Sequence, residues 1–534
     1  MPIEDSADED VAPSAADRWA TWTFVAAAVA AVPYILVQGR SHWFFLDDYD
    51  FLAARRLGSF SDLMRSHNGH WSTLPIVEYR LLYHLFGLNH YWPYQAVVVL
   101  AHVATAALLY LVMRRARVNP WIATAAGVLF LFLGSGADDI ESAFQVGFTG
   151  ALAFGLAFLV LVDRDGPLGR RDVLGMVCGL AALMCSAVGV AVVAAVGVAT
   201  LIRRGLKTAA VLVGPLAAVF LAWYVGYGHD VATSPSSTLT QKRIFVWASV
   251  SNVFGQLAHV PLVGWLLAGV LVAGAVVAFR TTPISVLRRR DAAIGALLLG
   301  GLAFIAITTV NRAWAVNPDN DGAARVSRYV YVGAAFFLPA IAAAASYLAR
   351  RRGLVILAVA ILLLVGLPGN FDHLYPQGGA RLTLGRPALI VALARSPLLA
   401  HAPAGMHPAP LRVGADLTPR WLRQARDDGK LPMGTAVTPS DRSTATLALS
   451  LEQVATPRRH DCRTVGPLET SSLRPGDEVR LREGVWIVSL VGPDGQVLAQ
   501  NSYFAGDRVL RVLAPVDVRV SAAGGPARAG ICTA

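Results

Sequence analysis

The sequence contains little charge. Charged residues make up 15% of its 534 residues and hydrophobic residues 55%, which is too apolar for a chain of soluble domains, so the bilayer is the expected solvent. Lysine is almost absent, since Lys207, Lys242 and Lys430 are the only ones. The net charge of +11 therefore comes from arginine. Because the arginines stand in short clusters between apolar runs, they predict membrane orientation rather than nucleic-acid binding.

The sequence also lacks internal repeats, coiled-coil heptads and the basic start that a signal peptide needs. Residues 1–17 are acidic and predict a disordered segment. Ala20–Gly39 is then apolar for about twenty residues, enough to cross a hydrocarbon core roughly 30 Å thick. We interpret Ala20–Gly39 as an uncleaved first span.

Long apolar runs continue to about Pro368 and, with the first span, predict a polytopic α-helical membrane protein of about eleven spans. The stretch Val173–Ile202 leaves the count open, because it is too long for one upright helix and short for two. The further candidate spans are Tyr91–Met113, Pro120–Gly134, Val146–Val162, Val173–Ser186, Ala187–Ile202, Thr208–Tyr227, Pro261–Phe279, Ala292–Val310, Val332–Leu348 and Leu354–Pro368.

Arginine clusters fall in alternate connections of this span list, so all of them are predicted on one side of the membrane. The positive-inside rule assigns that side, and the N-terminus, to the cytoplasm. The long first loop, residues 40–90, and the C-terminal part are then extracytoplasmic at the plasma membrane. The clusters are Arg114/Arg115/Arg117, Arg164/Arg170/Arg171, Arg203/Arg204/Lys207, Arg288/Arg289/Arg290 and Arg350/Arg351/Arg352.

The predicted domains are a transmembrane domain at 18–369 and an extracytoplasmic domain at 370–534, β-rich toward its C-terminal end. A small β-sandwich or jelly roll fits the alternating runs of this tail. Cys462 and Cys532 flank the runs in an oxidising compartment and predict a disulfide, whereas Cys178 and Cys185 lie in apolar helix and predict buried thiols. The predicted tail elements are a helix at Pro419–Asp428 and strands at Glu478–Arg482, Val485–Val491, Val497–Tyr503 and Val509–Val520.

Adjacent carboxylates follow the first span. Asp47 and Asp48 stand in the run Trp43-Phe44-Phe45-Leu46-Asp47-Asp48-Tyr49, and two acids at a membrane surface are costly unless they are paired, hydrated or metal-bound. A helix cap near Tyr49 would also explain them. The same loop carries His67, His70 and Glu78 among interfacial aromatics, which favours a site. Both histidines are candidates for substrate contacts, and a divalent cation held with the aspartates is the one cofactor considered.

These segments resemble the GT-C superfold of integral membrane glycosyltransferases. The resemblance covers about Arg18 to Pro368 and rests on a first span, an acidic pair in a long first external loop and a multispan body. The motifs Asp47-Asp48-Tyr49, His67-Asn68-Gly69-His70-Trp71, Ala143-Phe144-Gln145-Val146-Gly147-Phe148 and Ser327-Arg328-Tyr329-Val330-Tyr331 are also similar to uncharacterised actinobacterial membrane proteins.

The resemblance implies a sugar donor carried on a polyprenyl phosphate and an extracytoplasmic glycan, lipid or protein acceptor. In such enzymes a first-loop acid deprotonates or orients the acceptor hydroxyl while the lipid phosphate leaves with inversion. Asp47 and Asp48 match that position, and neither is preferred from the sequence. The pKa of one of two close carboxyls should be raised, which suits a general base.

The leaving phosphate needs cationic or hydrogen-bonding partners. Arg325, Arg328 and Tyr329 precede a late span on the predicted external side, and arginine binds phosphate in a bidentate way; anchoring to lipid headgroups would explain them equally. A short acidic loop with Asp139, Glu141 and Gln145 supplies further candidate contacts to sugar hydroxyls or metal. Its alternative role is capping of the next span.

The sequence therefore predicts an inverting membrane glycosyltransferase that uses a lipid-linked sugar. The alternative is a transporter or flippase of lipid-linked sugars, which would place polar groups near the bilayer midplane, whereas the carboxylates here gather in loops. His102, within the second span, is predicted to be a buried, hydrogen-bonded residue.

Overall fold

The computed structural model describes residues 14–229, 235–349, 352–374, 386–408, 414–455, 462–467, 469–481, 484–505, 509–523 and 529–533. The chain divides into two compact units. The first comprises Met1–Gly39, Met64–Leu74 and Gln95–Arg381, and the second comprises Arg40–Leu63, Pro75–Tyr94 and Leu382–Ala534. Two segments of the first loop thus group with the C-terminal chain, and the segment that carries His67 and His70 belongs to the first unit.

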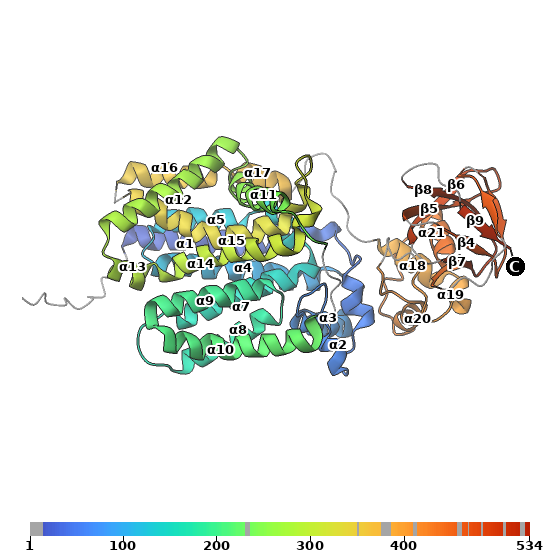
Figure 1. The fold of residues 1–534 in the computed structure, drawn as a ribbon, viewed down its shortest axis with the longest axis horizontal. Coiled ribbons are helices and arrows are strands. Elements are labelled where there is room, and N and C mark those ends of the chain that lie inside the picture. Colours follow the sequence, from blue (N-terminus) through green and yellow to red (C-terminus); the bar gives the residue numbers. More distant parts are fainter. Residues whose placement is uncertain are drawn as a thin grey trace, which may run out of the picture. The chain divides into compact units, whose positions relative to one another are not determined.

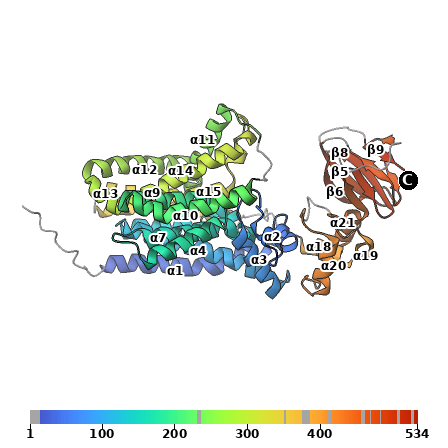
Figure 2. The same cartoon turned by 60° about the horizontal axis from the view of Figure 1, so that its bottom comes forward.

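Long helices that run alongside one another form the first unit (Figures 1 and 2). Ser14 caps the first helix at Ala15, because its hydroxyl accepts a hydrogen bond from the Asp17 amide; residues 1–13 of the predicted acidic segment lie outside the described residues. The helices are α1 (Ala15–Gln38), α4 (Trp92–Arg115), α5 (Pro120–Leu131), α6 (Ala137–Glu141), α7 (Val146–Val162), α8 (Arg170–Leu183), α9 (Val188–Arg204), α10 (Leu206–Trp223), α11 (Leu239–Ala258), α12 (Pro261–Thr281), α13 (Ile284–Arg290), α14 (Ala292–Arg312), α15 (Ser327–Ala349), α16 (Gly353–Leu364) and α17 (Leu367–Leu374).

The chain is a multi-pass helical membrane protein. Among the described residues, eight helices are long and apolar enough to cross a bilayer, and the bent pair Pro120–Leu131 and Gly134–Glu141 makes a ninth. The sequence predicts about eleven. The difference lies in the ambiguous stretch Val173–Ile202, which forms α8 and α9, of 14 and 17 residues, packed against each other and against α7.

Helix α15 lies at the centre of the first unit. In the most apolar 18-residue stretch of this span 83% of the residues are buried, whereas only 22% are buried in the spans that contain α1, α10, α12 and α16. Helix α15 packs against α5, α11, α12, α14 and α16. Its alanine-rich sequence permits this close packing, because small side chains let helix backbones approach in a membrane. At the contact with α12, a Cβ on Gly274 would lie 2.2 Å from the Ala344 carbonyl oxygen, so glycine is required there.

The arginine clusters gather at one end of the first unit, which we call the basic face. Arg114 at the end of α4 pairs with Asp17 at the start of α1, at 2.7 Å. Arg203 at the end of α9 pairs with Asp163 after α7, at 2.9 Å. Arg288 of α13 donates to the Ile202 carbonyl. These contacts agree with the prediction that alternate connections share one side; Arg350 and Arg351 lie outside the described residues.

The second unit combines two segments of the first loop with the C-terminal chain. The loop contributes the π-helix η2 (Asp50–Ala54), α2 (Phe60–Met64) and most of α3 (Thr73–Phe86). The C-terminal chain begins with α18 (Pro387–Arg395), α19 (Leu398–His401), α20 (Pro419–Asp427) and α21 (Pro439–Ser450). Thr418 caps α20 by accepting from the Trp421 amide at 3.3 Å. The helix begins at the predicted residue Pro419 and ends at Asp427, one residue before the predicted end.

The described C-terminal strands form two antiparallel sheets around Trp486, Val488 and Leu510. One sheet has the order β1-β7-β4-β9-β2 and the other β3-β8-β5-β6. The expected single strand Val509–Val520 is wrong: Pro515, which cannot donate to a ladder, separates β7 from β8. The strands are β1 (Leu451–Val454), β2 (Arg463–Val465), β3 (Ser471–Leu473), β4 (Glu478–Arg480), β5 (Gly484–Val491), β6 (Val497–Ala505), β7 (Val509–Val512), β8 (Val516–Ala522) and β9 (Ala529–Cys532).

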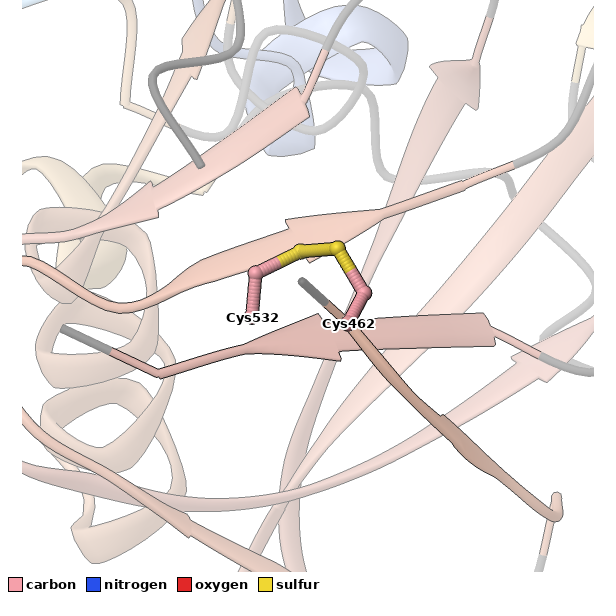
Figure 3. The surroundings of a disulfide bond; sticks show 2 residues. All are labelled: Cys462 and Cys532. Carbon is pink, nitrogen blue, oxygen red and sulfur yellow. A yellow bond between two sulfur atoms is a disulfide. The ribbon is translucent and has the colours of Figure 1, made fainter. Parts of the chain in front are cut away.

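A disulfide joins Cys462 and Cys532, the pair that the sequence analysis proposes (Figure 3). Cys462 directly precedes β2 and Cys532 ends β9, and these strands pair with each other, Arg463 opposite Ile531. The bridge therefore fastens the last strand of the chain to the edge of its sheet. Cys185 is buried, as predicted, whereas Cys178 is only partly buried.

Candidate active-site residues

The acidic pair lies on a tight turn of the second unit. The amides of Asp48, Tyr49 and Asp50 each donate to the carbonyl three residues earlier, at 3.1 Å, and Leu46 has a φ of 42°. A left-handed leucine costs roughly 1–2 kcal/mol, and such strain gathers at functional sites. The turn points the two side chains differently: Asp47 is exposed and Asp48 is only 3% exposed.

Asp48 is held by two hydrogen bonds. One carboxylate oxygen accepts from the Phe45 amide at 2.7 Å, and the other accepts from the Tyr79 hydroxyl of α3. The first bond is not that of an N-cap, which accepts from an amide that follows it, and the helix that begins at Asp50 has no side-chain cap at its N-cap residue Tyr49. The second bond joins residues far apart in the sequence. The pKa of Asp48 is raised to about 7, mainly by burial and in small part by the Asp47 charge, against the lowering effect of the two hydrogen bonds.

Glu78 lies close enough to Asp48 for their charges to interact. Both of its carboxylate oxygens are buried and accept no hydrogen bond within the described residues. Burial, and then the charge of Asp48, raise its pKa well above the ordinary value. Burial therefore favours the neutral form of Glu78, which as a carboxylic acid can donate a hydrogen bond.

The C-terminal chain packs on this turn, which the sequence did not indicate. The Tyr49 ring meets the Trp421 ring of α20 edge to face, with centroids 6.1 Å apart. Gly414 lies so close that an added Cβ would be 2.7 Å from the Tyr49 ring and 2.9 Å from the Leu46 carbonyl oxygen. Farther along the same loop, the Leu88 amide donates to the Lys430 carbonyl at 2.7 Å. Tail residues thus help to fix the acidic turn.

The two histidines lie in the first unit on a hairpin turn. Asn68 and Gly69 have φ angles of 49° and 82°, and His67 and His70 exchange both backbone hydrogen bonds, at 3.0 and 2.8 Å. Two left-handed residues are the requirement of a type I′ turn, for which Asn-Gly is the preferred sequence. The rings contact Phe144 and Phe148 respectively, with centroids 5.4 and 5.8 Å apart.

His70 is neutral in this environment. The Ala187 amide donates to its Nδ1 at 3.1 Å, so the ring proton resides on Nε2. The pKa of His70 is lowered to about 4, mainly by burial and then by the charges of His67, Arg312 and Arg328. His70 is therefore a hydrogen-bond donor through Nε2 near two cations.

Arg312 and Arg328 are the two arginines whose charges act on His70. Both are exposed, and neither makes an ion pair within the part of the chain that the structure describes. Arg325 differs, because it pairs with Asp321 at 2.7 and 2.8 Å. Arg312 is not singled out in the sequence analysis. Its position at the end of a span, on the side opposite the basic face, is the signal that could have indicated a role in the site.

The acidic loop before α7 does not cap that helix. Gln145 occupies the N-cap position of α7 without a capping hydrogen bond, and its side-chain oxygen is buried with no hydrogen bond among the described residues. Asp139 is fully buried, both of its carboxylate oxygens likewise lack hydrogen bonds there, and Arg328 acts on it electrostatically. Glu141 is 5% exposed. Asp139 and His70 thus each interact with the charge of Arg328, whereas Tyr329 packs its ring against Phe245 and Phe304.

Comparison with solved structures finds the crystal structure of ArnT from Cupriavidus metallidurans in the apo state, at a TM-score of 0.45 and 16% sequence identity, over 77% of this chain and 85% of that chain. No family model matches the chain. No curated protein matches it either. At this level of similarity, the chemistry has to be argued from this chain's own residues.

Two further residues bear on the interpretation. His102 is buried and bonded on both ring nitrogens, to the Tyr331 hydroxyl at 3.0 Å and the Leu131 carbonyl at 3.1 Å, which confirms its prediction as a structural residue. Trp223 is also buried; it stacks on Trp71 and donates to the Met64 carbonyl at 2.8 Å, so it supports the histidine turn. No group of three His, Cys, Asp or Glu side chains suited to a metal ion occurs among the described residues.

Proposed function

We propose that this protein is an inverting membrane glycosyltransferase of the GT-C type, which moves a sugar from a polyprenyl phosphate to an acceptor hydroxyl of a cell-envelope glycan, lipid or protein. The observation that carries the proposal is Asp48, a buried carboxyl with a pKa of about 7, near Glu78, whose pKa is also raised by burial. A general base works best when its pKa is near the operating pH. A turn built only as a cap needs no such shift.

In the proposed reaction Asp48 takes the proton of the acceptor hydroxyl as that oxygen attacks the anomeric carbon. The bond from the anomeric carbon to the phosphate oxygen breaks, and the polyprenyl phosphate leaves with the electron pair. Asp47, which is exposed, contacts the acceptor and keeps the Asp48 pKa high through its charge. Glu78, as a neutral acid, donates a hydrogen bond to a sugar or acceptor oxygen.

The negative charge of the leaving phosphate is assigned to Arg312 and Arg328. Both guanidinium groups lack ion pairs within the described ranges, so neither must give up an internal partner to bind phosphate, and arginine offers two parallel donors to it. His70 adds an Nε2–H donor. Asp139, Glu141 and Gln145 are proposed to contact sugar hydroxyls, and His67 orients the turn that carries His70.

The proposal also assigns the basic face to the cytoplasm and the acidic turn to the outside, because arginine-rich connections stay cytoplasmic. A transporter of lipid-linked sugars is the alternative function. It is less well supported, because the midspan residue His102 has both ring nitrogens occupied. Glu78, Asp139 and Gln145 are among the described residues with buried polar atoms that make no hydrogen bond.

The decisive experiment is a transfer assay on the purified full-length chain in proteoliposomes with a panel of radiolabelled polyprenyl-phosphate sugars. Wild-type protein should release free polyprenyl phosphate and label an envelope acceptor fraction, and Asp48→Asn should abolish both. Movement of intact donor across the bilayer without release of polyprenyl phosphate would support the transporter instead.

A further inference from the structure

An apolar cavity opens beside the basic face of the first unit. Its volume is about 670 Å³, and it lies among α12, α13, α14 and α15, which pack against one another with α13 at one end (Figures 1 and 2). Small side chains such as Ala275, Ala278, Gly295 and Ala340 form much of its wall. The absence of larger side chains at these positions creates the space.

The cavity has a polar end and an apolar end. Arg288, Asp291 and Tyr347 line the polar end, and Leu271 and Leu299 line the rest of the wall. From Asp291 to Leu299 helix α14 rises about 12 Å, most of the roughly 15 Å that one leaflet contributes to the hydrocarbon core. Leu299 is 52% exposed, so the cavity is open on the side of the helix bundle.

Positive charge remains available at the polar end. The Ile202 carbonyl accepts from Nε and Nη2 of Arg288, at 3.2 and 3.0 Å, which holds the guanidinium at the mouth. Its Nη1 makes no hydrogen bond within the described residues, and neither Arg288 nor the exposed Arg289 forms an ion pair there. Arg290 is different, because it pairs with Asp291 at 3.3 Å.

Asp291 supplies a second, independent indication of a ligand. One of its carboxylate oxygens accepts from the Tyr347 hydroxyl at 2.7 Å. The other is buried in the cavity wall and accepts no hydrogen bond from any described residue. A hydrocarbon chain alone leaves such an oxygen unsatisfied at a cost, whereas a headgroup that carries a hydroxyl satisfies it.

We propose that this cavity binds a phospholipid with an anionic headgroup, whose acyl chain fills the apolar space while its phosphate contacts Arg288. Basic pockets between spanning helices on the cytoplasmic side commonly recognise anionic headgroups. The site is separate from the residues assigned to sugar transfer, and the proposal does not depend on that function.

The test is native mass spectrometry of the full-length chain in detergent, titrated with dioleoyl phosphatidylglycerol or with dioleoyl phosphatidylcholine. Phosphatidylglycerol should bind about tenfold more tightly. Arg288→Gln should weaken its binding about fivefold, the typical effect of one basic residue near a lipid surface, and should leave phosphatidylcholine binding unchanged. Arg171→Gln, at an exposed arginine of α8 outside the cavity, is the matched control and should have no effect.

A second pair of variants tests the cavity itself. A Cβ on Gly295 meets nothing within 4 Å, so Gly295→Leu should fill the cavity and abolish binding of both lipids. Gly269→Leu, at an equally open glycine of α12 that does not line the cavity, should bind as the wild type does. Equal binding of the two lipids by wild-type protein would overturn the proposal. So would an equal loss in Arg171→Gln and Arg288→Gln, or competition by glycerol phosphate without acyl chains.

Discussion

Asp48→Asn separates a catalytic carboxyl from a structural cap, because a buried base predicts a gain in stability with a loss of activity, whereas a cap predicts little change in either. The pKa of Asp48 is raised from 3.8 to about 7, mainly by burial. Between these values the folded protein holds a proton that the unfolded chain has lost, so the Asp48 carboxyl makes folding less favourable as pH rises through this window. At 1.36 kcal/mol for each pKa unit, the cost at pH 8 is about 4 kcal/mol.

Asparagine removes this cost, since it does not ionise. Its single side-chain oxygen can accept from the Phe45 amide, and its NH₂ group can donate to the Tyr79 hydroxyl, which then acts as the acceptor. Allowing about 1 kcal/mol for the weaker hydrogen bonds, Asp48→Asn should be more stable than wild type by roughly 3 kcal/mol at pH 8. At pH 4 and below this gain disappears, and the variant should be less stable than wild type by up to about 1 kcal/mol.

Activity should change in the opposite direction. Loss of a general base typically lowers the rate about 10²- to 10⁴-fold, so the more stable variant should be almost inactive in the transfer assay. A cap predicts a different result, because asparagine caps about as well as aspartate. The wild-type rate should itself rise about tenfold per pH unit below pH 7 and level off above it.

The measurements are transfer rates and thermal unfolding in detergent at pH 5 and pH 8. Asp50→Asn is the matched control, two residues away: Asp50 forms a buried ion pair with Arg55 at 2.6 Å, so its loss should lower stability at both pH values. Wild-type activity in Asp48→Asn, or a loss of stability that is the same at both pH values, would refute the reasoning.

Four further predictions follow from single contacts. Asp47→Asn should move the midpoint of the pH–rate profile to lower pH, because the Asp47 charge helps to raise the Asp48 pKa; an unchanged midpoint would show that the two carboxyls are not coupled. Arg328→Ala should weaken donor use more than Arg328→Lys, and Arg312→Ala should also weaken it. Arg325→Ala is the control: it loses its pair with Asp321 and should keep wild-type donor kinetics. Equal, near-wild-type kinetics for both Arg328 variants would assign Arg328 to lipid anchoring. Gly414→Ala should lower the transfer rate about tenfold by displacing Tyr49. In the control Gly405→Ala the added Cβ meets nothing within 4 Å, so the transfer rate should not change. Equal transfer rates in the two variants would exclude the tail from positioning the acidic turn. Reduction of the Cys462–Cys532 bridge, which closes a separation of 70 residues, should lower the free energy of unfolding by about 4 kcal/mol. Chemical denaturation with and without reductant measures this difference, and equal free energies would show that the bridge contributes nothing.

Local sequence rules predict the elements of this protein well where a single interaction decides them. Asn68-Gly69 specifies the turn that carries both histidines, because few other residues accept two left-handed conformations. Thr418 and Ser14 mark helix starts through their side-chain caps. The stretch Val173–Ile202 is less predictable, because apolar composition gives its total length and tertiary packing against α7 decides where it breaks.

The candidate site is less predictable still, because its residues are distinguished by contacts that are distant in sequence. Asp47 and Asp48 are equivalent as a motif, and only the Tyr79 hydroxyl and burial make Asp48 the residue with the raised pKa. Arg325 and Arg328 are equally plausible in the sequence, and only the ion pair with Asp321 separates them. Tail residues Gly414 and Trp421 lie more than 300 residues from Tyr49, yet they fix the turn beside Asp48. A sequence motif can therefore locate the acidic turn, but the assignment of one carboxyl as the base depends on the folded unit around it.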